Sequence, residues 1–125
     1  MLRNILIVDD NEINRQMLQK MLQDEYHIIE ANNGEEALEI LQKSHEDISA
    51  VLLDILMPVL DGHGVLTQMR SSETLSNIPV IVATGNTEKG AEVRALALGA
   101  NDFVAKPYNP TIIKHRIRNT IKLRE

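Results

Sequence analysis

Cysteine is absent from the 125 residues of this chain, which excludes disulfide bonds and thiol chemistry and fits a reducing, cytoplasmic environment. Aromatic residues make up only 2% of the sequence, so aliphatic residues and methionine must build the core. No apolar run is long enough to cross a bilayer, and no signal-peptide pattern precedes the first strand-like segment. The formal net charge of −5 argues against a nucleic-acid-binding surface, because phosphate contacts need a basic face.

Strand-like and helix-like stretches alternate along the whole chain. The expected strands are residues 4–8, 26–31, a run that ends at residue 54, 78–84 and 102–105. The expected helices are residues 12–24, 35–43, a short one through 66–69 after a loop over 58–64, 88–98, and one that opens at residue 109 or 111. In the first helix Ile13, Met17 and Met21 recur at every fourth residue, and they are predicted to face the core with Leu18 and Leu22.

This alternation indicates an α/β fold in which a parallel sheet is covered by helices on both faces. We expect a single domain, residues 1–125, with one doubly wound five-stranded sheet. Right-handed crossovers leave few strand orders. The order 2-1-3-4-5 is taken from flavodoxin-like (βα)5 folds and does not follow from the sequence pattern itself.

Polar side chains close four of the five expected strands. They are Asp9 and Asp10 after the first strand, Asp54 after the third, Thr84 after the fourth and Lys106 after the fifth. In a parallel sheet these ends lie on one edge, where open α/β folds bind their ligands. Asp54 most needs an explanation, because a carboxylate that closes a buried strand is costly unless a charged group meets it.

Three clustered carboxylates repel one another, and a divalent cation would relieve that repulsion. Oxygen ligands without a His or Cys cluster indicate Mg²⁺, with Mn²⁺ as the alternative. With the metal held by Asp9 or Asp10 and by Asp54, an oxygen of Asp54 could attack a phosphoryl group and form an aspartyl phosphate. The cation and Lys106 would neutralise the developing charge, and Thr84 would donate a hydrogen bond to the product.

Each of these residues also has an ordinary structural explanation, and for Asp54 it is that of a plain turn residue, which fits the end of so apolar a strand less well. Asp9 or Asp10 could cap the helix that begins near residue 12, although a cap accounts for only one of them. Thr84 alone fits an ordinary strand residue, and Lys106 alone fits a solvated lysine. Because polar side chains close four strands at the same edge of the sheet, a functional site explains them better than four separate structural roles. The four histidines have no metal-ligand spacing and are taken as surface or structural residues.

Several short motifs accompany the residues at the strand ends. They are Asn33-Gly34-Glu35-Glu36-Ala37-Leu38, Met57-Pro58, Asp61-Gly62, Gly99-Ala100-Asn101-Asp102-Phe103 and Lys106-Pro107. In this order and spacing, and over essentially the whole chain, the sequence resembles the receiver domain of two-component response regulators.

The resemblance implies that Asp54 accepts a phosphoryl group from a phosphohistidine of a sensor histidine kinase or a phosphotransfer protein. The roles implied for the other residues are Mg²⁺ ligation by Asp9, Asp10, Asp54 and the backbone carbonyl of Leu56, switching by Thr84 and Phe103, and phosphate contact by Lys106. A cis peptide bond is expected between Lys106 and Pro107. The domain would catalyse only its own phosphorylation and dephosphorylation, and it is not expected to be an enzyme with a separate substrate.

Two features depart from the family's commonest pattern. Phe103 has no hydroxyl, so packing must govern its motion as a switch, and a simple core role explains it equally well. Leu56 and Asn86 stand where this family influences the attack of water on the phosphoaspartate. Leu56 cannot orient a water molecule, whereas Asn86 could.

Phosphorylation is expected to bias an existing inactive–active equilibrium and to reshape the face formed by the fourth helix, fifth strand and fifth helix. That face would contact an output domain or a downstream protein. The basic residues of the last helix are Lys114, Arg116, Arg118, Lys122 and Arg124. They fit a solvated face, a homodimer contact with Glu88 or Glu92 of a second copy, or a helix that continues into an output domain. No direct contact with nucleic acid or a membrane is expected.

Three other classes of protein share parts of this pattern. A metal-dependent phosphohydrolase would use the same Asp, Thr, Lys and Mg²⁺, but it usually places an acid two residues after the nucleophile, where Leu56 stands. A flavodoxin-like cofactor module would need hydroxyls and glycine in its first loop, where Asp9 and Asp10 would repel a phosphate. A P-loop NTPase is excluded because the sequence lacks G-x-x-x-x-G-K-[ST].

Overall fold

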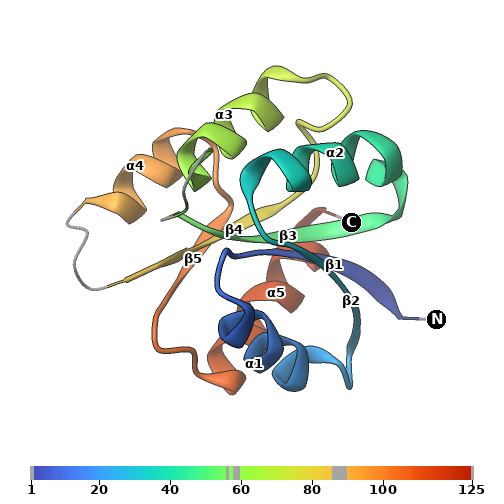
Figure 1. The fold of residues 1–125 in the computed structure, drawn as a ribbon, viewed down its shortest axis with the longest axis vertical. Helices are drawn as coiled ribbons and strands as arrows, with labels where there is room; N and C mark the ends of the chain where they lie inside the picture. Colours follow the sequence, from blue (N-terminus) through green and yellow to red (C-terminus); the bar gives the residue numbers. More distant parts are fainter. Residues whose placement is uncertain (1, 56, 58–59, 86–89, 125) are drawn as a thin grey trace.

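The computed structural model describes residues 2–55, 57, 60–85 and 90–124 (Figure 1). Its strands are β1 (Arg3–Val8), β2 (Tyr26–Ala31), β3 (Ile48–Asp54), β4 (Val80–Thr84) and β5 (Asp102–Ala105). Its helices are α1 (Glu12–Leu22), α2 (Gly34–Ser44), α3 (Gly62–Ser71), α4 (Ala91–Ala97) and α5 (Pro110–Arg124), and a 3-10 turn, η1 (His45–Asp47), precedes β3. In the part of the chain that is described, no helix has both the length and the apolar character that crossing a membrane requires.

The sheet has the order β2-β1-β3-β4-β5, and every neighbouring pair of strands is parallel. Helices α2, α3 and α4 cover one face, and α1 and α5 cover the other (Figure 1). The predicted doubly wound, flavodoxin-like fold is therefore confirmed. Because all five strands run in the same direction, β1, β3, β4 and β5 deliver their last residues to one edge of the sheet.

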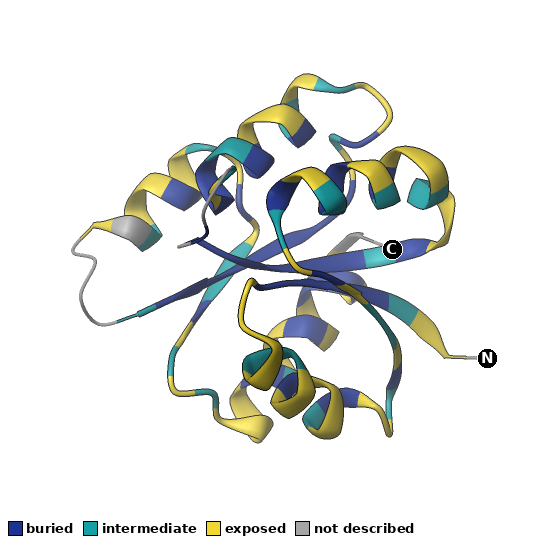
Figure 2. Ribbon diagram, in the orientation of Figure 1, coloured by how far each residue is buried: buried dark blue, intermediate teal, exposed yellow. Residues whose placement is uncertain are grey.

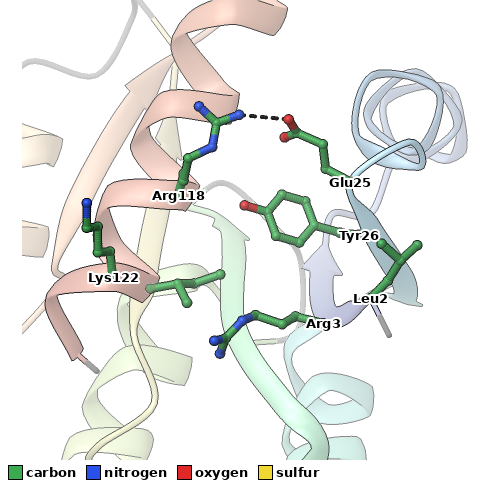
Figure 3. A pocket seen from close by; sticks show the side chains of 7 residues that line it. Leu2, Arg3, Glu25, Tyr26, Arg118 and Lys122 are labelled. Carbon is green, nitrogen blue, oxygen red and sulfur yellow. Dashed lines mark hydrogen bonds and ion pairs between the residues drawn. The ribbon is translucent and has the colours of Figure 1, made fainter.

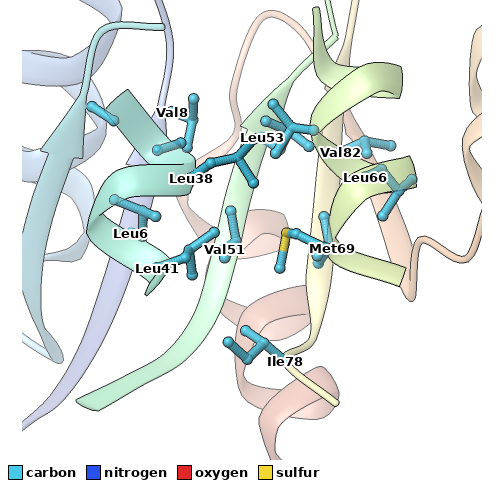
Figure 4. Close-up of a cluster of buried hydrophobic side chains, with 14 of the residues drawn as sticks. Leu6, Val8, Leu38, Leu41, Val51, Leu53, Leu66, Met69, Ile78 and Val82 are labelled. Atoms are coloured by element: carbon cyan, nitrogen blue, oxygen red, sulfur yellow. The ribbon is translucent and has the colours of Figure 1, made fainter. Parts of the chain in front are cut away.

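Two hydrophobic cores lie on the two faces of the sheet. Successive side chains of a strand point to opposite faces, so Leu53 packs beneath α2 and α3 (Figure 4) while Leu52 packs toward α1 and α5. The strands β3 and β4 are buried along almost their whole length (Figure 2). This burial on both faces explains why their sequences are nearly continuous apolar runs and do not alternate with polar residues.

The buried face of α1 differs from the predicted one. Leu18 and Leu22 are 1% and 0% exposed, but Met17 is 41% exposed and Ile13 is 69% exposed. A helix can bury only one stripe against a sheet, and in α1 that stripe runs through Leu18 and Leu22. Arg15 fixes this rotation, because its guanidinium bonds the side chain of Glu30 at the end of β2 at 3.0 Å. The prediction that Ile13 and Met17 belong to the core was wrong.

Several element boundaries also differ from the predicted ones. Strand β3 begins at Ile48, earlier than its most apolar residues suggested, and α3 begins at Gly62 within the segment that was expected to be loop. The early start of α3 has a local cause, since the side chain of Asp61 accepts a hydrogen bond from the backbone N–H of Gly64 at 2.9 Å. Residues 88–89, expected to open the fourth helix, lie outside the described residues.

We expect replacement of Asp61 by Ala to destabilise the protein by about 1 kcal/mol, the usual cost of losing a helix cap. An asparagine at this position keeps a side-chain oxygen for the same N–H, so Asp61→Asn should cost much less. Urea denaturation of the two variants and the wild type measures both effects. Equal losses in Asp61→Ala and Asp61→Asn would show that the charge of Asp61, and not its cap, stabilises α3.

Candidate acidic site at the sheet edge

Three aspartates meet where β1 and β3 end. Asp9, Asp10 and Asp54 each place a carboxylate oxygen within 4.8 Å of the other two. Asp9 and Asp54 are 1% and 5% exposed, whereas Asp10 is exposed to solvent. The parallel register of β1 with β3 brings these strand ends side by side, so the sequence positions and the geometry agree.

The loop between β1 and α1 holds Asp9 in place. One carboxylate oxygen of Asp9 accepts a hydrogen bond from the backbone N–H of Asn11 at 2.9 Å, and Arg15 donates to its backbone carbonyl at 2.6 Å. The helix cap itself is Asn11, whose side chain accepts from the N–H of Asn14 at 3.0 Å. Neither Asp9 nor Asp10 caps α1, so the ordinary explanation for these aspartates does not apply.

The second carboxylate oxygen of Asp9, Oδ2, is buried and has no hydrogen-bond partner among the described residues. A buried, unsatisfied carboxylate oxygen is costly, and a cation beside it would offset that cost. The three carboxylates supply the hard oxygen ligands that Mg²⁺ prefers. Within the described ranges, no other group of three potential metal-ligating side chains is so closely spaced. Leu56, whose carbonyl was expected to complete the set, lies outside them.

Lys106 reaches Asp54 from the other side of the site. Its Nζ atom lies 2.9 Å from Oδ1 of Asp54, and the side chains are 27% and 6% exposed. The backbone N–H of Lys106 bonds the carbonyl of Thr84 at 2.8 Å, which ties the end of β5 to the end of β4. The peptide bond to Pro107 is cis, as expected. The buried carboxylate therefore faces acidic groups on one side and an ammonium group on the other.

Thr84 and Phe103 lie on the neighbouring strands β4 and β5. Thr84 is 6% exposed at the last position of β4. Phe103 is half-buried and packs against the core on the α2, α3 and α4 face. This intermediate burial suits a ring that is neither locked in the core nor fully in solvent. Asn86, the candidate for orienting water, lies outside the described residues.

Tyr108 is a residue of this site that the sequence reasoning missed. Burial raises the pKa of its hydroxyl strongly, and the negative charges of Asp9 and Asp54 raise that pKa further. The hydroxyl therefore stays protonated, and it lies within the electrostatic field of the two buried aspartates. Tyr108 also lines a cleft of about 260 Å³ with Phe103 and Ile112. One sequence signal could have identified Tyr108 as a site residue. It is an aromatic residue two positions after Lys106, in a chain with almost no other aromatic residues.

The basic residues of α5 are largely engaged within the chain. The ion pairs are Lys114 with Asp24 at 3.0 Å, Arg116 with Asp102 at 3.3 Å and Arg118 with Glu25 at 2.7 Å. They connect α5 to the residues after α1 and to the start of β5. These contacts leave fewer cations for a second copy of the chain, and the homodimer contact stays a prediction. Glu88, one of its two expected acidic partners, lies outside the described residues.

Comparison with known proteins agrees with the geometry. The family profile described as "Response regulator receiver domain" matches residues 5–118. The "Probable transcriptional regulator ycf27" of Cyanophora paradoxa is 38% identical over 124 residues, which cover 98% of this chain and 50% of that protein. The chain spans about half the length of the curated relatives it matches, as in this case.

Two solved structures show the same fold. A response regulator receiver domain protein from Clostridium thermocellum superposes with a TM-score of 0.91 at 26% identity, and the match covers 98% of this chain and 96% of that one. The receiver domain of the sensor histidine kinase PA1611 from Pseudomonas aeruginosa gives a TM-score of 0.84 at 27% identity, over 98% and 99% of the two chains. That structure has a magnesium ion coordinated in its active-site cleft.

Proposed function

This chain belongs to the response regulator receiver family of two-component signalling, and we propose that its Asp54 accepts a phosphoryl group from a phosphohistidine of a sensor histidine kinase or phosphotransfer protein. The observation that carries the proposal is the buried carboxylate of Asp54, 2.9 Å from the Lys106 ammonium and grouped with Asp9 and Asp10. Residues 1–125 would act as one phosphoacceptor unit. Its role is that of a signalling domain, not of an enzyme that turns over a separate substrate.

In the proposed reaction, a carboxylate oxygen of Asp54 attacks the phosphorus atom. The bond from phosphorus to the imidazole nitrogen breaks, and the histidine keeps the electron pair. The negative charge that collects on the phosphoryl oxygens must be met by positive groups. Lys106 can meet this charge because its ammonium group already lies beside Asp54.

We assign Mg²⁺, or Mn²⁺ in its place, to Asp9, Asp10 and Asp54, with the backbone carbonyl of Leu56 as a further predicted ligand. The unsatisfied, buried Oδ2 atom of Asp9 supports this assignment. When bound, the cation supplies neutralisation of the phosphoryl oxygens during the transfer. The protein's own contribution is to hold the carboxylates together and to keep Lys106 in place on the opposite side.

Lys106→Met should slow phosphorylation by acetyl phosphate in the presence of Mg²⁺ by about tenfold, the effect of losing one charge-assisted hydrogen bond in the transition state. Intact mass spectrometry over time gives the rate. Lys43→Met is the matched control, because Lys43 is exposed in the last turn of α2 and its loss should leave the rate unchanged. A wild-type protein that gains no phosphoryl group would refute the proposed function itself.

We propose that the donor protein docks on the apolar strip formed by Ile13 and Met17 on α1. Both side chains are exposed, and α1 begins two residues after Asp10, so the strip borders the acidic site. The double variant Ile13→Ser, Met17→Gln should slow transfer from a phosphorylated histidine-phosphotransfer protein several-fold. Its rate with acetyl phosphate, which needs no docking surface, should equal that of the wild type. Equal slowing with both donors would show that the two substitutions impair phosphoryl transfer to Asp54 itself and not the docking of the donor protein.

For the output, we propose that Thr84 moves to bond the phosphoryl group and that Phe103 shifts with it, so that the face of α4, β5 and α5 changes. The half-buried ring of Phe103 and the cleft that it lines with Tyr108 support such a change. Beryllium fluoride, which mimics the phosphoryl group on an aspartate, should then shift amide NMR signals across residues 84–110. Unchanged signals over that range would contradict this switch and leave the phosphorylation of Asp54 unaffected. An output domain or a downstream protein would read the altered face.

A further inference from the structure

A second concave site lies where β1 and β2 begin and α5 ends, at the edge of the sheet opposite the acidic site. It has a volume of about 490 Å³. Its lining residues are Leu2, Arg3, Glu25, Tyr26, Arg118, Ile121 and Lys122 (Figure 3). We call it the basal pocket. None of these residues takes part in the chemistry assigned to Asp54.

The basal pocket concentrates positive charge in a chain whose formal net charge is −5. Arg3, Arg118 and Lys122 line it, and Glu25 is its one acidic lining residue. Glu25 already forms an ion pair with Arg118, with 2.7 Å between Oε1 of Glu25 and Nη2 of Arg118. Among the described residues, no carboxylate forms an ion pair with Lys122. Lys122 therefore adds positive charge to the lining beyond the pair that Glu25 forms with Arg118.

Tyr26 gives the basal pocket a hydrogen-bond donor. The residue is only 7% exposed, and its hydroxyl points into the pocket toward α5 (Figure 3). Its hydroxyl is in none of the hydrogen bonds found in the described part of the chain. Burial raises the pKa of this hydroxyl, and the charge of Glu25 raises it as well. The hydroxyl therefore stays protonated and is available to donate to a ligand.

We propose that the basal pocket binds a small ligand that carries two or more oxyanion groups, either phosphates or carboxylates. Guanidinium, ammonium and phenol groups are all donors, and charge-assisted hydrogen bonds to an oxyanion are the strongest that such groups make. The ring of Tyr26 with Leu2 and Ile121 offers apolar surface for the carbon skeleton of the ligand. The volume falls in the range of pockets for small molecules. The guanidinium of Arg118, of which only Nη2 contacts Glu25, also suits planar oxyanions, which a guanidinium can bind in a bidentate manner.

The test is an NMR titration of the ¹⁵N-labelled full chain with pyrophosphate and, separately, with citrate. Mg²⁺ is left out, so that the acidic site repels both probes and Asp54 is not modified. We expect saturable amide shifts at the residues that line the basal pocket. Lys122→Gln should weaken the affinity about tenfold, since one charge-assisted contact is lost. Tyr26→Phe, which keeps the ring and removes only the hydroxyl, should weaken it several-fold.

Lys43→Gln removes a cation that is also exposed but lies on the opposite face of the sheet, and this variant should bind the probes as the wild type does. Tighter binding of pyrophosphate than of citrate would assign a phosphate-bearing ligand, and the reverse would assign a polycarboxylate. Shifts that rise without saturation at lysines and arginines over the whole surface would overturn the proposal. So would saturable binding that Lys122→Gln and Tyr26→Phe leave unchanged. None of these outcomes depends on whether Asp54 accepts a phosphoryl group.

Discussion

Asp54→Asn is expected to gain no phosphoryl group from acetyl phosphate and Mg²⁺ under conditions that modify the wild type fully. The amide keeps the shape of the side chain but lacks the negative oxygen that attacks phosphorus. Asp9 and Asp10 are less suited to its role, because neither carboxylate bonds a cationic side chain in the described contacts, and Oδ1 of Asp9 is already held by the N–H of Asn11. Of the three aspartates, only Asp54 bonds the ammonium group of Lys106 among the described contacts of the site.

Intact mass spectrometry distinguishes the possibilities directly. The wild type should gain one phosphoryl group, and the gain should disappear when EDTA removes Mg²⁺. Asp47→Asn is the matched control, because Asp47 lies exposed in η1 and its loss should not change the modification. A full phosphoryl gain in Asp54→Asn would mean that another side chain is the acceptor, and the assignment of Asp54 would then be wrong.

The sheet and its polar edge could be predicted because their signals are local in the sequence. A strand such as residues 51–54 is an apolar run that stops at a charged residue, and parallel pairing then forces such ends onto one edge. Asp9, Asp10 and Asp54 accordingly lie within 4.8 Å of one another. The strand order came from the known fold, since no local sequence pattern in this chain shows which strands become neighbours. The roles of the site residues stay predictions, which the experiments on Asp54 and Lys106 test.

The features that sequence reasoning missed depend on contacts between distant parts of the chain. Ile13 and Met17 have the spacing of a buried stripe, yet α1 is rotated by contacts of Leu18 and Leu22 with the sheet and of Arg15 with Glu30. No pattern within α1 distinguishes these two apolar stripes. Similarly, nothing local to α5 shows that Arg118 pairs with Glu25, because 93 residues separate them.

The importance of Tyr108 and Gly62 could not be predicted from the sequence for another reason. Their sequence positions near Lys106 and Asp61 are plain, but the importance of each depends on distances that only the folded chain defines. Tyr108 lies within the field of Asp9 and Asp54. Gly62 lies against the backbone that carries Asp54. The second case leads to the largest expected change in stability.

Gly62→Ala should destabilise the protein by about 3 kcal/mol, at the upper end of the usual cost of overpacking. A Cβ atom on Gly62 would lie 2.6 Å from the carbonyl oxygen of Asp54 and 2.7 Å from Cα of Ile55. Both are backbone atoms, so no side-chain rotation can relieve the contact. Either α3 must move away from the sheet or the end of β3 must bend and carry Asp54 with it.

Gly64→Ala is the matched control, because Gly64 lies in the same first turn of α3. There the added Cβ would meet Cδ1 of Leu60 at 2.6 Å, which is the end of a flexible side chain. Both variants gain the same helix propensity from Ala, so their difference isolates the contact with the backbone of β3. Urea denaturation should place the midpoint of Gly62→Ala far below that of Gly64→Ala. If the two midpoints coincide, α3 does not rest on the end of β3 as closely as these distances require, and the pairing of β3 with β4 would position Asp54 without help from α3.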